Sequence, residues 1–344
     1  MHLTMEDVAQ RAGVSKATVS LVLNKKPGVA PETRQAILRA VEDLGYRLPE
    51  HRPLRSLKRK TITILHHVID ESRAEPYNVV LGFLRGARAF ALEANVHLTL
   101  LAGYQKEALE HIGTQFLDSD GLPPEGLILM GPGLRRDSES VVQALRSNIP
   151  VVVLCRDWPE EPISTVGHRH SEQAGIALEH LTYLGHRAIA FLAGEADVKY
   201  DWYQQRLGCY RKAMADLNGE SDAELVVLAR DGARAVKSLM ARRPDVTAIF
   251  AVHDAKAIEA MQGLRDIGLR VPEDVSVIGQ DDARQSPEGY PALTTVRFSH
   301  MEVGYLAAEL LLKQIENEEI TRGNIWVRSH LVERESCCGA RTVR

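Results

Sequence analysis

Several residues near the N-terminus have side chains that suit contacts with DNA. Lys16 can donate hydrogen bonds to guanine acceptors, and Ala17 can contact a thymine methyl group. Ser20 follows in the same short segment, and we expect all three residues to face base edges or phosphates. Leu21 has no hydrogen-bonding group, so the choice of DNA sequence must depend on few polar contacts.

The residues around this segment predict two short helices that would position it. Thr4 is a suitable N-cap for a first helix, Gly13 tolerates the left-handed turn that ends it, and Ser15 can cap a second helix immediately. Two short helices joined by a tight glycine-containing turn are typical of a helix-turn-helix. The second helix of that motif enters the major groove of DNA.

A third helix is predicted to begin at Pro31 and to stop at Gly45. Ile37, Val41 and Leu44 repeat at helical spacing and should pack beneath the first two helices. This spacing alone leaves a second interpretation open, namely an ordinary three-helix cap on an enzyme.

The net charge separates the N-terminal segment from the rest of the chain. Residues 1–60 contain 12 Lys/Arg and 6 Asp/Glu, which gives a net charge of +6. Because the 344-residue chain carries −4, residues 61–344 carry −10. A basic end on an acidic body favours a phosphate-binding module, and a merely solvated charged face is the alternative.

Residues 4–46 together resemble the head-piece of the LacI/GalR family of bacterial transcription regulators. The matching segments are Asp7-Val8-Ala9, Ala12-Gly13-Val14-Ser15, Thr18-Val19-Ser20, Val22-Leu23-Asn24, Thr33-Arg34 and Leu44-Gly45-Tyr46. The resemblance implies a homodimer that binds pseudo-palindromic double-stranded operator DNA, with one head-piece on each half-site. The residues expected to contact DNA are Thr4, Ser15, Lys16, Ala17, Thr18, Ser20, Asn24, Arg34 and Tyr46.

Residues 47–60 are interpreted as a linker. In the family the linker holds a short hinge helix that folds on the operator and inserts a leucine into the minor groove. Pro53 can occupy only the first turn of a helix, so Leu57 is the better candidate for this leucine and Leu54 the second, with Arg55 between them. A disordered basic tether that contacts only phosphates is the alternative.

From Thr61 onward the sequence alternates between apolar strands and amphipathic helices, a pattern that predicts doubly wound parallel sheets. Two sets of about four strands predict two similar lobes with a cleft between them. The first set of strand candidates is Ile62–Ile69, Val96–Leu101, Gly126–Met130 and Pro150–Leu154, and the second is Ala188–Ala193, Leu225–Leu228, Ala248–Val252 and Val275–Ile278.

The family resemblance extends over this body. Among the matching segments are Gly185-His186-Arg187, Phe191-Leu192-Ala193-Gly194, Asp281-Asp282 and Arg334-Glu335-Ser336. The resemblance implies an α/β effector-binding and dimerisation domain over residues 61–344, similar to periplasmic sugar-binding proteins. We expect its first lobe at about 61–157 and 294–322, and its second at about 158–293 and 323–344.

Ligands bind such sheets beyond the carboxyl ends of the strands, so the loops after strands are the candidate effector site. Asp281 follows one strand and could accept sugar hydroxyls, while the fork of Arg206 suits hydroxyls or carboxylates. Aromatic residues around Trp202 could stack on a sugar ring or simply pack in the cleft. The effector residues expected are Asp70, Tyr77, Trp202, Arg206, His253, Asp254 and Asp281. For Asp254 and Asp281, capping of the following helix or loop is the alternative.

Several positions depart from the family pattern. Cys155 stands where many relatives have Asp, Arg169-His170 where an Asp-Asn pair is common, Gln173 where Gly is usual, and Gln280 where an aromatic residue is usual. Extra His and Arg near the cleft suggest the hypothesis of an acidic or larger ligand rather than a neutral hexose.

Other features limit the function classes. No Cys/His set has metal-ligand spacing and no cofactor is implied. The apolar runs are too short to span a membrane, and the N-terminus has no signal-peptide pattern, which predicts a cytoplasmic protein. The sequence has no nucleophile elbow or Gly-rich phosphate loop, which argues against an enzyme. We therefore expect a ligand-switched DNA-binding repressor; the alternative is a sugar-binding protein or enzyme with a basic appendage.

Overall fold

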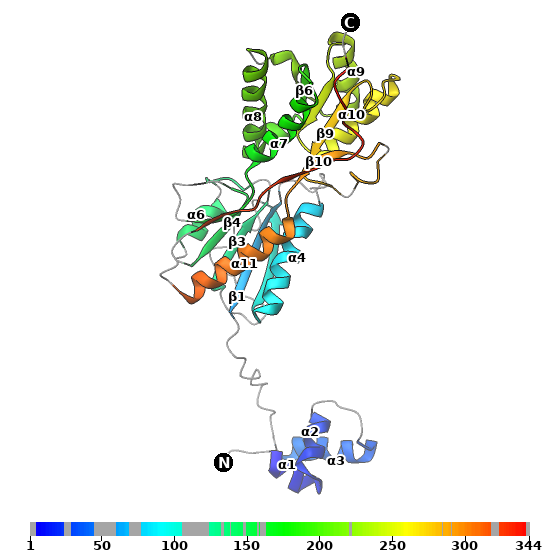
Figure 1. The fold of residues 1–344 in the computed structure, drawn as a ribbon. Helices are drawn as coiled ribbons and strands as arrows, with labels where there is room; N and C mark the ends of the chain where they lie inside the picture. The colour runs from blue at the N-terminus through cyan, green and yellow to red at the C-terminus, as the bar shows by residue number, and fades with distance from the viewer. Residues whose placement is uncertain are drawn as a thin grey trace. The chain divides into compact units, whose positions relative to one another are not determined.

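The computed structural model divides the chain into two compact units, residues 1–59 and 60–344, which are considered separately (Figure 1). The residues described are 5–23, 29–44, 60–68, 77–104, 124–131, 134–137, 139–146, 149–156, 158, 163–219, 222–283, 285–289, 291–317 and 323–341.

The N-terminal unit contains three helices around a small apolar core. The helices are α1 (Met5–Ala12), α2 (Lys16–Leu23) and α3 (Pro31–Leu44). Gly13 ends α1 with a φ of 65°, the left-handed conformation that the sequence predicted. The buried core residues are Val8, Ala9, Val19, Val22, Ile37 and Ala40. Because each helix contributes to this core, its packing fixes the orientation of α2 within the unit.

The second unit contains two six-stranded sheets, each the centre of one lobe. The first sheet has the order β11-β5-β4-β3-β1-β2, and its described strands pair in parallel. Its strands are β1 (Thr61–Val68), β2 (His97–Tyr104), β3 (Gly126–Met130), β4 (Val151–Leu154), β5 (Ser164–Gly167) and β11 (Asn324–Trp326). Parallel strands need helical crossovers, which bring the carboxyl ends of the strands to one edge.

The second sheet repeats this plan with the order β12-β10-β9-β8-β6-β7. Its strands are β6 (Ile189–Ala193), β7 (Val226–Leu228), β8 (Ala248–Ala251), β9 (Ser276–Gln280), β10 (Thr294–Arg297) and β12 (His330–Val332). The β10–β12 pair is antiparallel and the other pairs are parallel. The prediction of two doubly wound sheets is confirmed, and four short strands extend them beyond the predicted sets.

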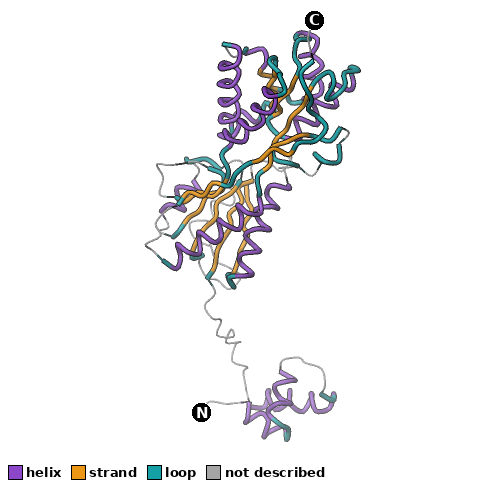
Figure 2. The backbone as a smooth tube through the Cα atoms, viewed as in Figure 1, coloured by secondary structure: helices purple, strands orange, loops and turns teal. Residues whose placement is uncertain are grey.

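Helices cover both faces of each sheet (Figure 2). In the first lobe α4 (Tyr77–Glu93) and α11 (His300–Glu316) pack on one face and α6 (Glu139–Arg146) on the other. In the second lobe α7 (His170–Tyr183) and α8 (Asp201–Asn218) pack on one face, and α9 (Gly232–Arg242) and α10 (Asp254–Asp266) on the other. Two single-turn helices, η1 (Asp197–Lys199) and η2 (Ala223–Leu225), precede α8 and β7.

The chain crosses between the lobes later than the sequence indicated. Residues 164–167 and 324–326 belong to the first sheet, and residues 294–297 belong to the second. The expected boundaries at 157/158, 293/294 and 322/323 were therefore wrong by several residues each. The reason is that β5, β10 and β11 have three or four residues each, too few to show a strand period.

No helix among the described residues is long and apolar enough to cross a membrane.

Candidate functional site

The start of α2 carries the polar residues that the sequence assigned to DNA. The Oγ atom of Ser15 accepts a hydrogen bond from the Thr18 backbone N–H at 3.2 Å, so Ser15 is the predicted N-cap. The Ser15 and Thr18 hydroxyls also bond to each other at 2.8 Å. Lys16 is exposed and forms a 3.5 Å ion pair with Glu6, which is also exposed. An exposed pair of this kind is weak, so DNA phosphates can compete for Lys16.

Only some of the other predicted DNA contacts lie within the described residues. Arg34 lies in the first turn of α3, and its N–H bonds to the Ala30 carbonyl at 2.9 Å. Ala17 and Ser20 lie in α2, but their side chains fall outside the described part of the structure. The residues that lie wholly outside the described ranges are Thr4, Asn24, Tyr46, Leu54, Arg55, Leu57 and the effector candidate Asp70. Tyr77 begins α4, and its side chain is likewise not described.

Asp281 lies at the carboxyl end of β9 on strained backbone. Its φ is 92° and that of Asp282 is 48°, conformations that residues with a Cβ rarely adopt. The Asp282 carboxylate holds this elbow by bonding to Arg334 at 2.6 Å and Arg297 at 3.3 Å. Strained backbone of this kind is common at functional sites, where the surrounding structure holds it in place. The strain therefore makes the Asp281 side chain a candidate functional group.

Arg206 brings a cation to Asp281 from another element. One guanidinium nitrogen of Arg206, on α8, donates to Asp281 Oδ1 at 2.9 Å and to Gln173 Oε1 at 2.7 Å. The other terminal nitrogen donates to the Val252 carbonyl at the end of β8. The Arg206 side chain is 3% exposed and that of Asp281 is 18% exposed, so the carboxylate is the more accessible member of the pair.

Gln173 completes this cluster from α7. Its Nε2 atom donates to Asp281 Oδ1 at 3.1 Å and to the Val296 carbonyl at 3.0 Å. Gln173 is fully buried, so it fixes both Arg206 and Asp281 from a position where the family commonly has glycine. The sequence identified Gln173 only as a departure from the family pattern. Its role depends on contacts between residues that are far apart along the chain.

Burial keeps the nearby histidines neutral. It lowers the pKa of His168 to about 3, with Arg206 acting in the same direction, and it also lowers the pKa values of His170, His253 and His300. Burial acts to raise the pKa of Asp281, the adjacent Arg206 cation acts to lower it, and the net result is a lowered pKa. At neutral pH these histidines therefore add no positive charge, and the hypothesis of an acidic or larger ligand stays a prediction.

Trp202 and His253 lie beside Arg206. The guanidinium of Arg206 lies 5.3 Å from the centre of the Trp202 ring, which stacks on Tyr200 at 5.4 Å. The His253 ring lies 6.3 Å from the Trp202 ring, and its Nδ1 accepts the Lys256 N–H as the cap of α10. The structure thus brings together four predicted effector residues, namely Trp202, Arg206, His253 and Asp281.

Asp254, which the sequence assigned to the effector, is buried and bonded to protein donors. It is 2% exposed, and it accepts hydrogen bonds from the Ala283 N–H and the hydroxyls of Ser286 and Thr295 at 2.6 to 2.7 Å. A Cβ at Gly279 would lie 2.1 Å from its carboxylate, so only glycine permits this approach. These contacts favour the alternative role for Asp254, because its oxygens anchor the loop after β9.

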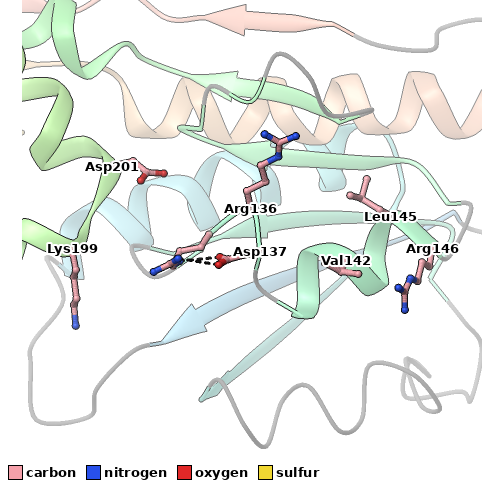
Figure 3. A pocket seen from close by; sticks show the side chains of 8 residues that line it. Arg136, Asp137, Val142, Leu145, Arg146, Lys199 and Asp201 are labelled. Atoms are coloured by element: carbon pink, nitrogen blue, oxygen red, sulfur yellow. Dashed lines mark hydrogen bonds and ion pairs between the residues drawn. The ribbon is translucent and has the colours of Figure 1, made fainter.

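A pocket of about 790 Å³ lies between the two lobes (Figure 3). Its lining residues are Arg135, Arg136, Asp137, Val142, Leu145 and Arg146 from the first lobe and Lys199 and Asp201 from the second. These cations were not predicted from the sequence. The signal was present, because Arg135 and Arg136 follow the carboxyl end of β3, where the same rule that selected Asp281 applies.

Within the described residues, no three His, Cys, Asp or Glu side chains are arranged to hold a metal ion. His168 Nε2 lies 3.0 Å from His170 Nδ1, and Cys155 Sγ lies 3.7 Å from His168 Nδ1. Burial raises the pKa of the Cys155 thiol to about 11, so the group remains protonated at neutral pH.

Comparisons with known sequences match both units. Residues 4–48 match the family described as bacterial regulatory proteins, lacI family, and residues 178–337 match a periplasmic binding protein-like domain. The HTH-type transcriptional regulator CelR of Thermobifida fusca is 32% identical over 342 residues, covering 97% of this chain and 98% of the relative. The HTH-type transcriptional repressor PurR of Haemophilus influenzae is 30% identical, with 92% of each chain covered.

Solved structures show the same fold. A complex of the transcriptional regulator CelR with cellobiose has a TM-score of 0.68 and 32% identity, and covers 97% of this chain and 99% of its own. A lac repressor dimer bound to operator and an anti-inducer also has a TM-score of 0.68 and covers 98% of this chain and 100% of its own, at 24% identity. These relatives are regulators rather than enzymes. The chain belongs to the LacI family of bacterial regulatory proteins, with a helix-turn-helix head-piece and a periplasmic-binding-protein-like effector domain.

Proposed function

We propose that this regulator represses transcription as a homodimer on pseudo-palindromic operator DNA, and that a carbohydrate bound between its lobes switches its affinity for the operator. The observation that carries the proposal is the arrangement of Arg206, Asp281 and Trp202. A largely buried charged pair beside an aromatic ring suits the hydroxyls and the apolar face of a sugar.

In this proposal Asp281 is the principal hydroxyl acceptor. Arg206 and Gln173 both donate to Oδ1, so among the described contacts Oδ2 is the oxygen left for ligand hydroxyls. Trp202 offers a ring to the sugar, and His253 contributes a neutral imidazole from the start of α10. The relative whose structure is titled as a cellobiose complex supports this ligand class.

The DNA-binding part rests on the head-piece. Ser15 holds the start of α2, and Lys16 is exposed beside it with only a weak ion pair to displace. Because Lys16 can bond to guanine acceptors, it is the residue most able to discriminate among bases at this end of the helix. Ligand-driven closure of the lobes would bias the dimer between two spacings of its head-pieces.

The experiment selects the preferred sequence from a randomised DNA library with the full-length protein, then measures binding against salt by fluorescence anisotropy. We expect a pseudo-palindrome and an affinity that falls linearly with log salt concentration. Lys16→Ala should relax the base preference at one position of each half-site. The binding free energy lost there should be roughly 1–3 kcal/mol. Lys212→Ala, which removes an exposed lysine of α8, is the matched control and should change nothing.

Cellobiose is then added to the protein–DNA complex, with Arg206→Ala and Asp281→Ala variants beside it. A saccharide at ~100 times its dissociation constant adds roughly 2.7 kcal/mol of stability, so a thermal shift should accompany the change in DNA affinity. The proposal fails if no sequence is enriched from the library. Its carbohydrate part fails if neither cellobiose nor other neutral mono- and disaccharides shift the melting temperature or the DNA affinity.

A further inference from the structure

Three short segments of the described chain lead from one lobe to the other (Figure 1). Residues 168–169 connect β5 to α7, residues 298–299 connect β10 to α11, and residues 327–329 connect β11 to β12. A change in the angle between the lobes must bend these crossovers, because the layers on either side are packed as rigid bodies. Side chains packed between the crossovers are therefore sensitive to the angle between the lobes.

Four aromatic rings form a continuous stack at the first two crossovers. His168 lies flat on Phe298, with the ring centroids 3.6 Å apart and 20° between the planes. His170 meets the edge of His168 at 4.3 Å. His300 meets Phe298 edge-on at the same distance. Because His168 and Phe298 come from different crossovers, the stack joins one crossover to the other.

His168 and His170, the crossover histidines, are enclosed by protein. They are 3% and 8% exposed. His168 Nε2 lies 3.0 Å from His170 Nδ1, and Cys155 Sγ lies 3.7 Å from His168 Nδ1. The 3.0 Å contact requires one nitrogen to donate and the other to accept, so the two facing nitrogens hold one proton between them. The Nε2 atom of His170 has no hydrogen-bond partner among the described residues.

The charges around the crossover histidines oppose a further proton. Burial lowers the pKa of His168 to about 3, and Arg206 acts in the same direction while Asp281 opposes it. Burial also lowers the pKa of His170, and the neighbouring His168 acts in the same direction. Arg206 and Arg156 add to that effect. The packed pair is therefore neutral.

His300, the first residue of α11, is the third histidine of the stack. Burial lowers its pKa, although Asp281 and Asp282 act to raise it. Its Nε2 atom has no hydrogen-bond partner among the described residues, and His300 also acts to lower the pKa of His168. The packed stack thus favours neutral rings at all three positions.

Arg156 and Arg206 approach the crossover histidines from different lobes. Arg156 follows β4 and donates to the Gly131 carbonyl at 2.8 Å, whereas Arg206 lies on α8. If the lobes separate, one of these cations moves away and water reaches the rings. Both causes that keep the rings neutral are then weakened.

We propose that the crossover histidines form a proton-sensitive hinge: protonation of His168 and His170 favours separation of the lobes, so mild acid opposes lobe closure whichever ligand drives it. The sign follows from burial, because a packed ring excludes the proton that an exposed ring binds near its ordinary pKa of about 6.5. Below that pH, each ring favours the open form by about tenfold for every unit of pH.

The test measures the distance between the lobes in the full-length protein by single-molecule fluorescence transfer. Dyes are placed through unnatural amino acids at exposed positions 146 on α6 and 234 on α9, and excess unlabelled protein leaves at most one labelled chain in each dimer. We expect the ratio of open to closed molecules to rise at least about tenfold from about pH 7.5 to about pH 5.5.

Variants locate the protons. His168→Phe and His170→Phe keep aromatic rings in the stack but cannot titrate, so each should reduce the response and the double variant should abolish it. His97→Phe is the matched control, because His97 begins β2 at the end of the first sheet away from the crossovers, and it should respond as wild type does.

Hydrogen exchange of the wild type keeps the inference testable if a variant fails to fold. The reporters are the N–H groups of Gln173 and Val327, which donate to the carbonyls of Arg169 and Gly167 beside the crossovers. Their opening equilibrium constants should rise about tenfold over the same pH range, while those of β3 stay nearly constant.

The inference fails if the wild type shows the same lobe distances at both pH values, or if the reporters open no more than β3 does. A response that survives the double variant at the level of His97→Phe would place the protons elsewhere and overturn the assignment to the crossover histidines.

Discussion

Asp254 and Asp281 follow neighbouring strands of the second sheet, yet the fold gives them opposite roles. Asp281 lies next to the Arg206 cation, remains 18% exposed and has a lowered pKa. Asp254 is surrounded by neutral donors at 2% exposure, and burial raises its pKa to about 7 although Ser286 and Thr295 act to lower it. The difference shows that a neighbouring cation keeps a strand-end carboxylate charged, whereas burial among neutral donors raises its pKa.

The largest expected effect comes from removing the buried anchor. Asp254→Ala leaves the Ala283 N–H and the Ser286 and Thr295 hydroxyls without their acceptor in a dry site. We expect a loss of about 4 kcal/mol in the free energy of unfolding, measured by urea denaturation. Asp266→Ala, at the exposed end of the same helix, is the control and should cost far less. Equal losses would remove the distinction between anchor and surface acid.

A smaller effect should follow from the titration of Asp254. Its pKa is raised from 3.8 to about 7, so between these values the native state holds a proton that the unfolded chain has released. Stability should therefore fall as pH rises, by about 2 kcal/mol between pH 5 and pH 7. Asp254→Asn removes the titration, so the difference in unfolding free energy between wild type and variant should vary with pH. A difference that stays constant across this range would contradict the assignment.

The smallest effect concerns the backbone under Asp281. Asp281→Ala and Asp281→Gly both remove the carboxylate and leave the Arg206 charge unpaired, but only glycine adopts a φ of 92° without strain. We expect the glycine variant to be about 1 kcal/mol more stable than the alanine variant, and both to lose binding of the effector. Thermal denaturation and calorimetry measure the two quantities. If alanine were the more stable variant, the elbow would not be a strained support for a ligand group.

Local rules selected Arg206 and Asp281, which the structure brings together, but they did not reveal contacts between residues that are far apart along the chain. Both residues were identified because each matches a family position, and Asp281 also follows a strand end. Gln173 meets these two residues across sequence separations of 33 and 108 residues, and no local pattern encodes such a contact. Arg135 and Arg136, which follow β3 and line the pocket, were not predicted from the sequence.

The same limit applies to the fold. The helix-turn-helix was predictable residue by residue, because Gly13 and Ser15 act on their immediate neighbours. The crossing points between the lobes were not, because β5 and β10 have only four residues each. They become strands by pairing with β4 and β9, and the sequence of such a short segment carries little information about its partner.

The sequence alone determined the basic helix-turn-helix, the alternation of strands and helices, and the strand ends near which ligand residues must lie. These are local properties of charge, capping and hydrophobic period. Only the tertiary structure placed Arg206 against Asp281 and three neutral donors around Asp254. It also buried the nearby histidines, which keeps them neutral. The reason is physical: the charge state of a side chain depends on burial and on partners supplied by other elements, and only folding brings these together.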